Sequence, residues 1–114
     1  MTDPADLTPE GWHTTYSVQE SGQWADSLHL TDEALQDLLD TARLQCESYA
    51  PAVEGPVPVN YRQAQLLQAR NLWQAVKQDT GGQVDGGGFS IPVYPLDWVV
   101  KGILRPKRGV PSFG

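Results

Sequence analysis

The sequence predicts a mainly α-helical protein, a small helical bundle of two long antiparallel helices and a short C-terminal helix. Two segments, about 31–49 and 58–79, carry apolar residues at helical spacing. A third apolar segment, about 96–104, is short and runs into a stretch that is rich in proline and glycine. An extended N-terminal arm and an extended C-terminal tail are expected to flank the bundle. A chain of 114 residues has room for one small domain, so we treat 1–114 as a single unit.

The first thirty residues are expected to form the N-terminal arm, 1–30. Residues 12–19 alternate between polar side chains and the strand-forming residues Trp12, Thr14, Tyr16 and Val18. A period of two predicts a strand, and Ser21-Gly22 ends it. The next residues, 24–30, fit either a short helical turn or an extended lead-in.

The first long helix is predicted from about Thr31 to Tyr49. Thr31 is a favourable N-cap residue, and the two acids that follow it lie at the positive end of the helix dipole. Pro51 ends the helix. One apolar stripe runs along it, formed by Leu35, Leu38, Leu39, Ala42, Cys46 and Tyr49.

The second long helix is predicted from about Pro58 to Asp79, and together the two form a helical hairpin, 31–80. Its larger apolar face holds Tyr61, Leu66, Ala69, Leu72, Trp73 and Val76, and a smaller one holds Ala64, Leu67 and Ala75. Two apolar surfaces need two sets of neighbours, of which the first helix is one. The other is either an adjacent subunit or the arm. The residues predicted to form the core or a subunit interface are Leu35, Leu38, Leu39, Leu66, Leu67, Leu72, Trp73 and Val76.

The last third of the chain divides into two parts. Residues 81–93 are a glycine-rich loop in which Phe89–Val93 has strand composition but contains proline, so it forms at most an edge strand or a short β-hairpin. Residues 94–114 are a short helix, about 96–104, and a tail that proline and glycine keep from forming a helix. We expect this part to dock on another molecule through Trp98, Lys101, Arg105, Pro106, Lys107, Arg108, Gly109, Val110, Pro111 and Phe113.

Charge is distributed unevenly along the chain. Residues 1–60 hold eleven acids and one base, a net −10, whereas residues 61–114 hold three acids and seven bases, a net +4. The total of −6 disfavours binding to nucleic acid. The polarity suits either a head-to-tail contact between subunits or neutralisation between two helices of one chain.

The residues predict neither catalysis nor a bound cofactor. His13 and His29 are far apart in sequence and Cys46 is the sole cysteine, so no spacing matches a metal site. Gly86-Gly87-Gly88 lacks the lysine and hydroxyl residue of a phosphate-binding loop. No nucleophile stands out, and we expect no enzyme. The acidic Met1–Asp6 is not a signal peptide, and no apolar run is long enough to span a membrane.

Three segments carry a resemblance to a known family. The first is Leu38-Leu39-Asp40-Thr41-Ala42-Arg43-Leu44-Gln45-Cys46-Glu47-Ser48-Tyr49-Ala50-Pro51. The second runs from Val57-Pro58-Val59-Asn60-Tyr61 to Asn71-Leu72-Trp73, and the third from Pro95-Leu96-Asp97-Trp98 to Leu104-Arg105-Pro106-Lys107-Arg108-Gly109-Val110-Pro111. Together they resemble the head-to-tail connector, or adaptor, proteins of long-tailed bacteriophages, especially those of actinobacteria. The third segment is the most specific, and the resemblance covers about residues 30–111.

The resemblance implies a virion neck protein that assembles in the host cytoplasm and has no catalytic role. Such subunits form a homo-oligomeric ring, usually a 12-mer, under the portal protein, and duplex DNA passes through its channel without specific binding. The C-terminal tail, here Arg105 to Gly114, would dock on the portal, and the opposite side of the ring would receive a stopper or tail-completion protein. The alternative is a small cytosolic helical binding or regulatory module that uses its basic C-terminal tail.

Overall fold

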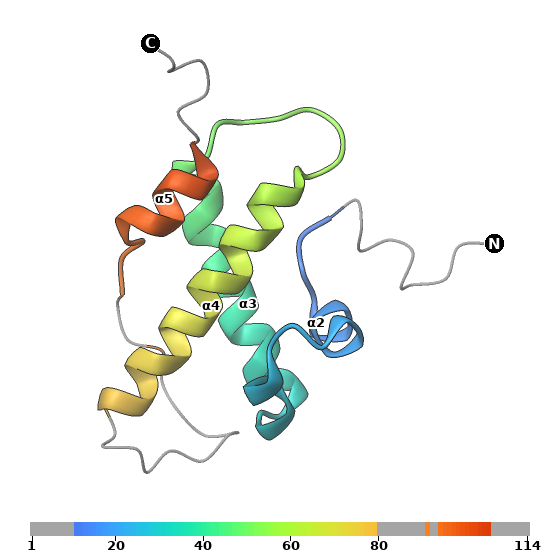
Figure 1. Cartoon of the computed structure of the whole chain (residues 1–114), viewed down its shortest axis with the longest axis vertical. Helices are drawn as coiled ribbons and strands as arrows, with labels where there is room; N and C mark the ends of the chain where they lie inside the picture. Colours follow the sequence, from blue (N-terminus) through green and yellow to red (C-terminus); the bar gives the residue numbers. More distant parts are fainter. Residues whose placement is uncertain (1–10, 80–90, 92–93, 106–114) are drawn as a thin grey trace, which may run out of the picture.

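The computed structural model describes residues 11–79, 91 and 94–105, and the fold over these ranges is helical (Figure 1). The elements, in order, are α2 (Thr15–Ser21), the 3-10 helix η2 (Ala25–His29), α3 (Asp32–Tyr49), α4 (Val59–Asp79) and α5 (Trp98–Leu104). No strand occurs in these ranges. The prediction of a mainly α-helical bundle is therefore confirmed.

The long helices α3 and α4 lie side by side and run in opposite directions (Figure 1). Helix α3 begins after Thr31, whose side-chain oxygen accepts a hydrogen bond from the Ala34 amide at 3.1 Å. It ends before Pro51, and the hydroxyl of Tyr61 on α4 donates to the Pro51 carbonyl at 2.6 Å. This bond closes the hairpin across the connection between the two helices.

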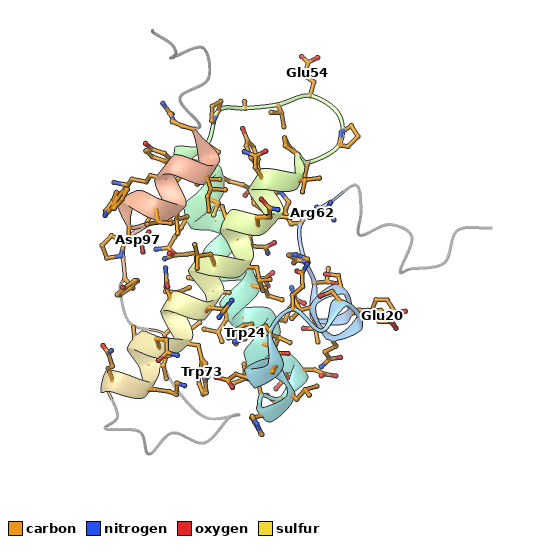
Figure 2. The ribbon with its side chains drawn as sticks, in the orientation of Figure 1. Glu20, Trp24, Glu54, Arg62, Trp73 and Asp97 are labelled. Atoms are coloured by element: carbon orange, nitrogen blue, oxygen red, sulfur yellow. The ribbon has the colours of Figure 1, made fainter. Side chains whose placement is uncertain are left out.

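The main hydrophobic cluster lies in the half of the hairpin formed by the start of α3 and the later part of α4, toward the bottom of Figure 1. Leu35, Leu38 and Leu39 of α3 pack against α4, and the segment before α3 adds Val18, Trp24 and Leu30. Figure 2 labels Trp24 and Trp73, both members of this cluster. An ion pair between Lys77 Nζ and Asp26 Oδ2, at 3.6 Å, joins the end of α4 to η2.

A second cluster lies where α5 crosses the other end of the hairpin. Val100 and Leu104 of α5 are buried there with Cys46, Tyr61 and Ala64. Leu67 packs against the same cluster. Ala64 and Leu67 of the smaller apolar face of α4 thus pack with α5 of the same chain, and Trp12 of the N-terminal segment packs against the same cluster.

The strand expected over residues 12–19 was wrong, because residues 15–21 form helix α2. A capping box begins this helix: the Ser17 amide donates to Thr14 Oγ1 at 3.2 Å, and the Thr14 amide donates to Ser17 Oγ at 2.8 Å. Gly22, with φ +68°, ends it in the left-handed conformation that glycine adopts readily. These local bonds outweigh the alternation of side chains.

The extended arm is also corrected over its described part. Residues 12–30 fold back on the hairpin, with Val18 and Trp24 in the main cluster. Residues 1–10 lie outside the described residues. So does the strand expected at 89–93, apart from Ile91, which packs against the main cluster.

Candidate docking surface

Helix α5 is held on the hairpin by polar bonds at both ends of segment 94–105. At its start, the Asp97 side chain caps the helix by accepting from the Val100 amide at 2.9 Å, and Asn71 Nδ2 donates to Asp97 Oδ2 at 3.3 Å. Figure 2 labels Asp97 at this position. At its end, Asn60 Nδ2 donates to the Ile103 carbonyl at 2.8 Å. The helix therefore has a fixed position although it is only two turns long.

The outer face of α5 leaves large apolar side chains uncovered. Trp98 is 82% exposed, and Val99 and Tyr94 are exposed beside it. Trp98 and Val99 border an open groove of about 710 Å³ that is also lined by Tyr49, Lys101, Gly102, Ile103 and Arg105. Single exposed apolar residues are ordinary, but an exposed tryptophan at the edge of an apolar groove is typical of an interaction site.

The groove has a basic rim. Lys101 Nζ lies 5.5 Å from the ring centroid of Tyr49, and the Arg105 guanidinium carbon lies 4.6 Å from it. Arg105 Nε also donates to the Tyr49 carbonyl at 2.8 Å. One tyrosine thus positions both cations at the same end of the groove.

The predicted docking residues are in part brought together by this surface. Trp98, Lys101 and Arg105 all line the groove. The rest of the predicted set, Pro106, Lys107, Arg108, Gly109, Val110, Pro111 and Phe113, lies outside the described residues.

The predicted core or interface residues lie inside the bundle. Leu67 is half-buried against the second cluster. The others are buried in the main cluster, and they are Leu35, Leu38, Leu39, Leu66, Leu72, Trp73 and Val76.

Two buried glutamines on α4 were missed by the sequence analysis. Gln65 Nε2 donates to the Leu39 carbonyl at 3.0 Å, and Gln65 Oε1 accepts from the His13 amide at 2.6 Å. One turn further on, Gln68 Nε2 donates to the Tyr94 carbonyl at 3.0 Å. Gln65 thus ties the N-terminal segment to the hairpin, and Gln68 ties the start of segment 94–105. The available signal was a polar residue, Gln65, on the apolar face of α4.

A second hollow, of about 330 Å³, lies between α2 and the start of α4, and His13 is its one histidine. His13 Nδ1 lies 2.9 Å from Ser17 Oγ, but that hydroxyl already belongs to the capping box of α2. Burial, and secondarily the charge of Arg62, lowers the pKa of His13. We therefore assign the histidine and serine pair a structural role at the start of α2.

Cys46 lies in the second cluster, where burial raises its pKa to about 12. No group of three or more His, Cys, Asp or Glu side chains in the described ranges is placed to hold a metal ion. Among the helices of those ranges, none has the length and apolar character needed to cross a bilayer.

Comparisons with protein-family models, with curated proteins and with solved structures found no match to this chain.

Proposed function

We propose that this protein is a structural virion protein, a head-to-tail connector that forms a ring between the portal and the tail or stopper protein and conducts DNA without catalysis. The observation that supports this most directly is the anchoring of α5 on the hairpin at Ile103 and Arg105, after which the sequence continues with the basic segment 106–114. This is the region in which the resemblance to connector proteins is most specific.

Helix α5 gives the docking segment a fixed starting point. Arg105 is bonded to the Tyr49 carbonyl, and the residues before it are anchored on both long helices. Segment 106–114 has two prolines, two glycines and two basic residues, so it has little apolar surface with which to fold alone. In our proposal Lys107 and Arg108 meet acidic groups of the portal, and Val110 and Phe113 fill apolar pockets.

Repetition around a ring would turn a weak tail contact into a stable assembly. Each docked tail raises the effective concentration of the next, so affinity accumulates without any single strong contact. Backbone pairing on either side of Pro106 and Pro111 would add to the affinity of each tail.

The acidic half of the sequence fits passage of DNA through such a ring. Exposed acids of this half, among them Glu33 and Glu54, repel phosphates. In our proposal part of the acidic surface of residues 1–60 lines the channel. Purified protein should then fail to retard duplex DNA at low salt. Tight and salt-sensitive binding of DNA would instead favour the regulatory module with a basic tail.

The deciding experiment is a truncation after Arg105, which keeps the bond to Tyr49. The shortened chain should retain its helical signal and melting temperature, because segment 11–105 contains both hydrophobic clusters. It should fail to join heads that contain portal. The matched control is a full-length chain with residues 106–114 in scrambled order. If the truncated protein attaches to heads as well as the natural chain, the tail is not the portal anchor.

A further inference from the structure

The groove on α5 contains a glycine that the described part of the chain does not explain. Gly102 lies inside the helix, although glycine stabilises a helix less than alanine does. A Cβ atom at Gly102 would meet nothing within 4 Å, and its φ is not in the left-handed region. Nothing in the described residues therefore requires glycine there, whereas a partner that approaches this face of the helix closely would favour it.

A complementary surface lies on the outer side of α3. Leu44 is 66% exposed and lies on the side of the helix opposite its apolar stripe. Asp37, Asp40 and Glu47 stand seven and four residues before it and three after it, so helical spacing places them around it. This acidic outer face is thus an exposed leucine flanked along the helix by three acids, of which Glu47 is paired with Arg43 at 3.2 Å and Asp40 accepts a hydrogen bond from Gln36 at 2.8 Å.

We propose that the acidic outer face of α3 in one copy of this chain seats in the α5 groove of a second copy. Leu44 would lie over Gly102, between Trp98 and Ile103, and Asp40 and Asp37 would face Lys101 and Arg105. The apolar centre and acidic surround of one surface complement the apolar floor and basic rim of the other. This contact deepens the proposed connector function, since it supplies the subunit interface of the ring.

The occupant is a second copy because the two surfaces do not cover each other within one chain. Both Leu44 and Trp98 are largely exposed in the folded monomer. The two surfaces differ, so each copy offers one of each, and repetition builds a ring or a filament unless two copies exchange the contact reciprocally.

The test is a disulfide trap in the full-length chain. One preparation carries Leu44→Cys and a second, distinguished by a tag, carries Val99→Cys. The natural Cys46 is buried and does not compete. Mixed at high concentration and low salt under mild oxidation, the two should give a cross-linked heterodimer well above the yield of a control pair. The control pairs Val99→Cys with Leu28→Cys, an exposed leucine of η2 outside both surfaces.

Charge reversal provides the second measurement. Asp40→Lys and Lys101→Glu should each weaken self-association in sedimentation, and mixing the two single variants should restore a contact between them. Trp98→Ala should weaken self-association by roughly thirtyfold, as expected for an aromatic anchor. All three substitutions are at exposed positions, so the fold should persist.

The outcomes separate this contact from the connector function. A trap yield equal to that of the control pair overturns the contact, even if rings form on portal. Trp98→Ala that abolishes attachment to heads but leaves self-association unchanged also overturns it, because the groove then belongs to the portal. A high yield of cross-linked heterodimer, in protein that forms only reciprocal dimers, supports the contact and contradicts the proposed ring.

Discussion

Two tryptophans at the edges of the hairpin have opposite environments. Trp24 precedes η2 and is 5% exposed, whereas Trp98 begins α5 and is 82% exposed. Trp24 packs in the main cluster with residues of α3 and α4, whereas Trp98 belongs to neither cluster. Helix α5 is held by Val100, Leu104 and polar bonds instead. The comparison indicates that the N-terminal flank completes the fold and that the C-terminal flank presents a surface.

The largest expected effect is the contrast between Trp24→Ala and Trp98→Ala. Removing the buried ring should lower the free energy of unfolding by about 3–5 kcal/mol, because it leaves a cavity in the main cluster. Trp73→Ala, in the same cluster, should behave alike. Trp98→Ala should change stability by less than about 0.5 kcal/mol. Urea denaturation of the three variants tests this prediction. Equal losses of unfolding free energy in Trp24→Ala and Trp98→Ala would contradict the difference between the two flanks.

A smaller loss of stability is expected when the hydrogen bonds from Gln65 to the N-terminal flank are removed. Gln65→Leu leaves the His13 amide and the Leu39 carbonyl without their side-chain partner, which should cost about 1–3 kcal/mol. The matched control is Gln63→Leu, an exposed position two residues away. Amide exchange at His13 should accelerate only in the first variant. Similar exchange in both would show that Gln65 does not hold this segment.

The third prediction concerns the C-terminal flank and changes Asp97, the residue that caps α5. Asp97→Ala removes the acceptor for the Val100 amide and should weaken α5 by about 1 kcal/mol, while Asp97→Asn should keep most of the cap. Hydrogen exchange along α5 is the measurement. If alanine and asparagine give the same exchange rates, the cap does not contribute to the stability of α5.

The smallest expected effect is a loss of stability at lower pH, which arises from the protonation of His13 in the N-terminal flank. Burial, with Arg62, lowers its pKa below the usual 6.5, so the unfolded chain binds more protons than the folded one. The stability associated with neutral His13 is fully present above pH 6.5. It is lost as the pH falls from 6.5 toward the lowered pKa, and it levels off below that. Chemical denaturation between pH 7.5 and 5 should show this loss, and His13→Asn should remove it.

The parts of the fold that depend on local pattern were accessible to sequence analysis. The apolar stripe and the N-cap Thr31 predicted α3, and the broad apolar face predicted α4. The short helix expected at about 96–104 is α5, which begins at Trp98 after its cap Asp97. Helix α2 was not predicted, because the alternation of Thr14, Tyr16 and Val18 suggests a strand and conceals a capping box. Only Val18 of those three is buried, so the alternation does not mark a buried face.

The groove on α5 could be predicted from the sequence only in part, because it also depends on residues far away along the chain. The apolar and basic residues of α5 are visible in the sequence. The groove also needs Tyr49, whose carbonyl and ring contact Arg105 across 56 positions of sequence. Likewise, Gln65 reaches His13 across 52 positions. Such partners are set by how the helices pack, which no local pattern specifies.

The burial of Cys46 makes the reactivity of its thiol a measure of how often the second cluster opens. A thiol reacts with alkylating reagents as the thiolate, and a pKa of about 12 leaves almost none of that form at neutral pH. Alkylation therefore requires the second cluster, to which α5 contributes Val100 and Leu104, to open, and its rate reports those openings. A partner that clamps α5 would slow the reaction, while one that pulls the helix away would speed it. The alkylation rate of Cys46 would thereby report whether docking tightens or loosens this end of the molecule.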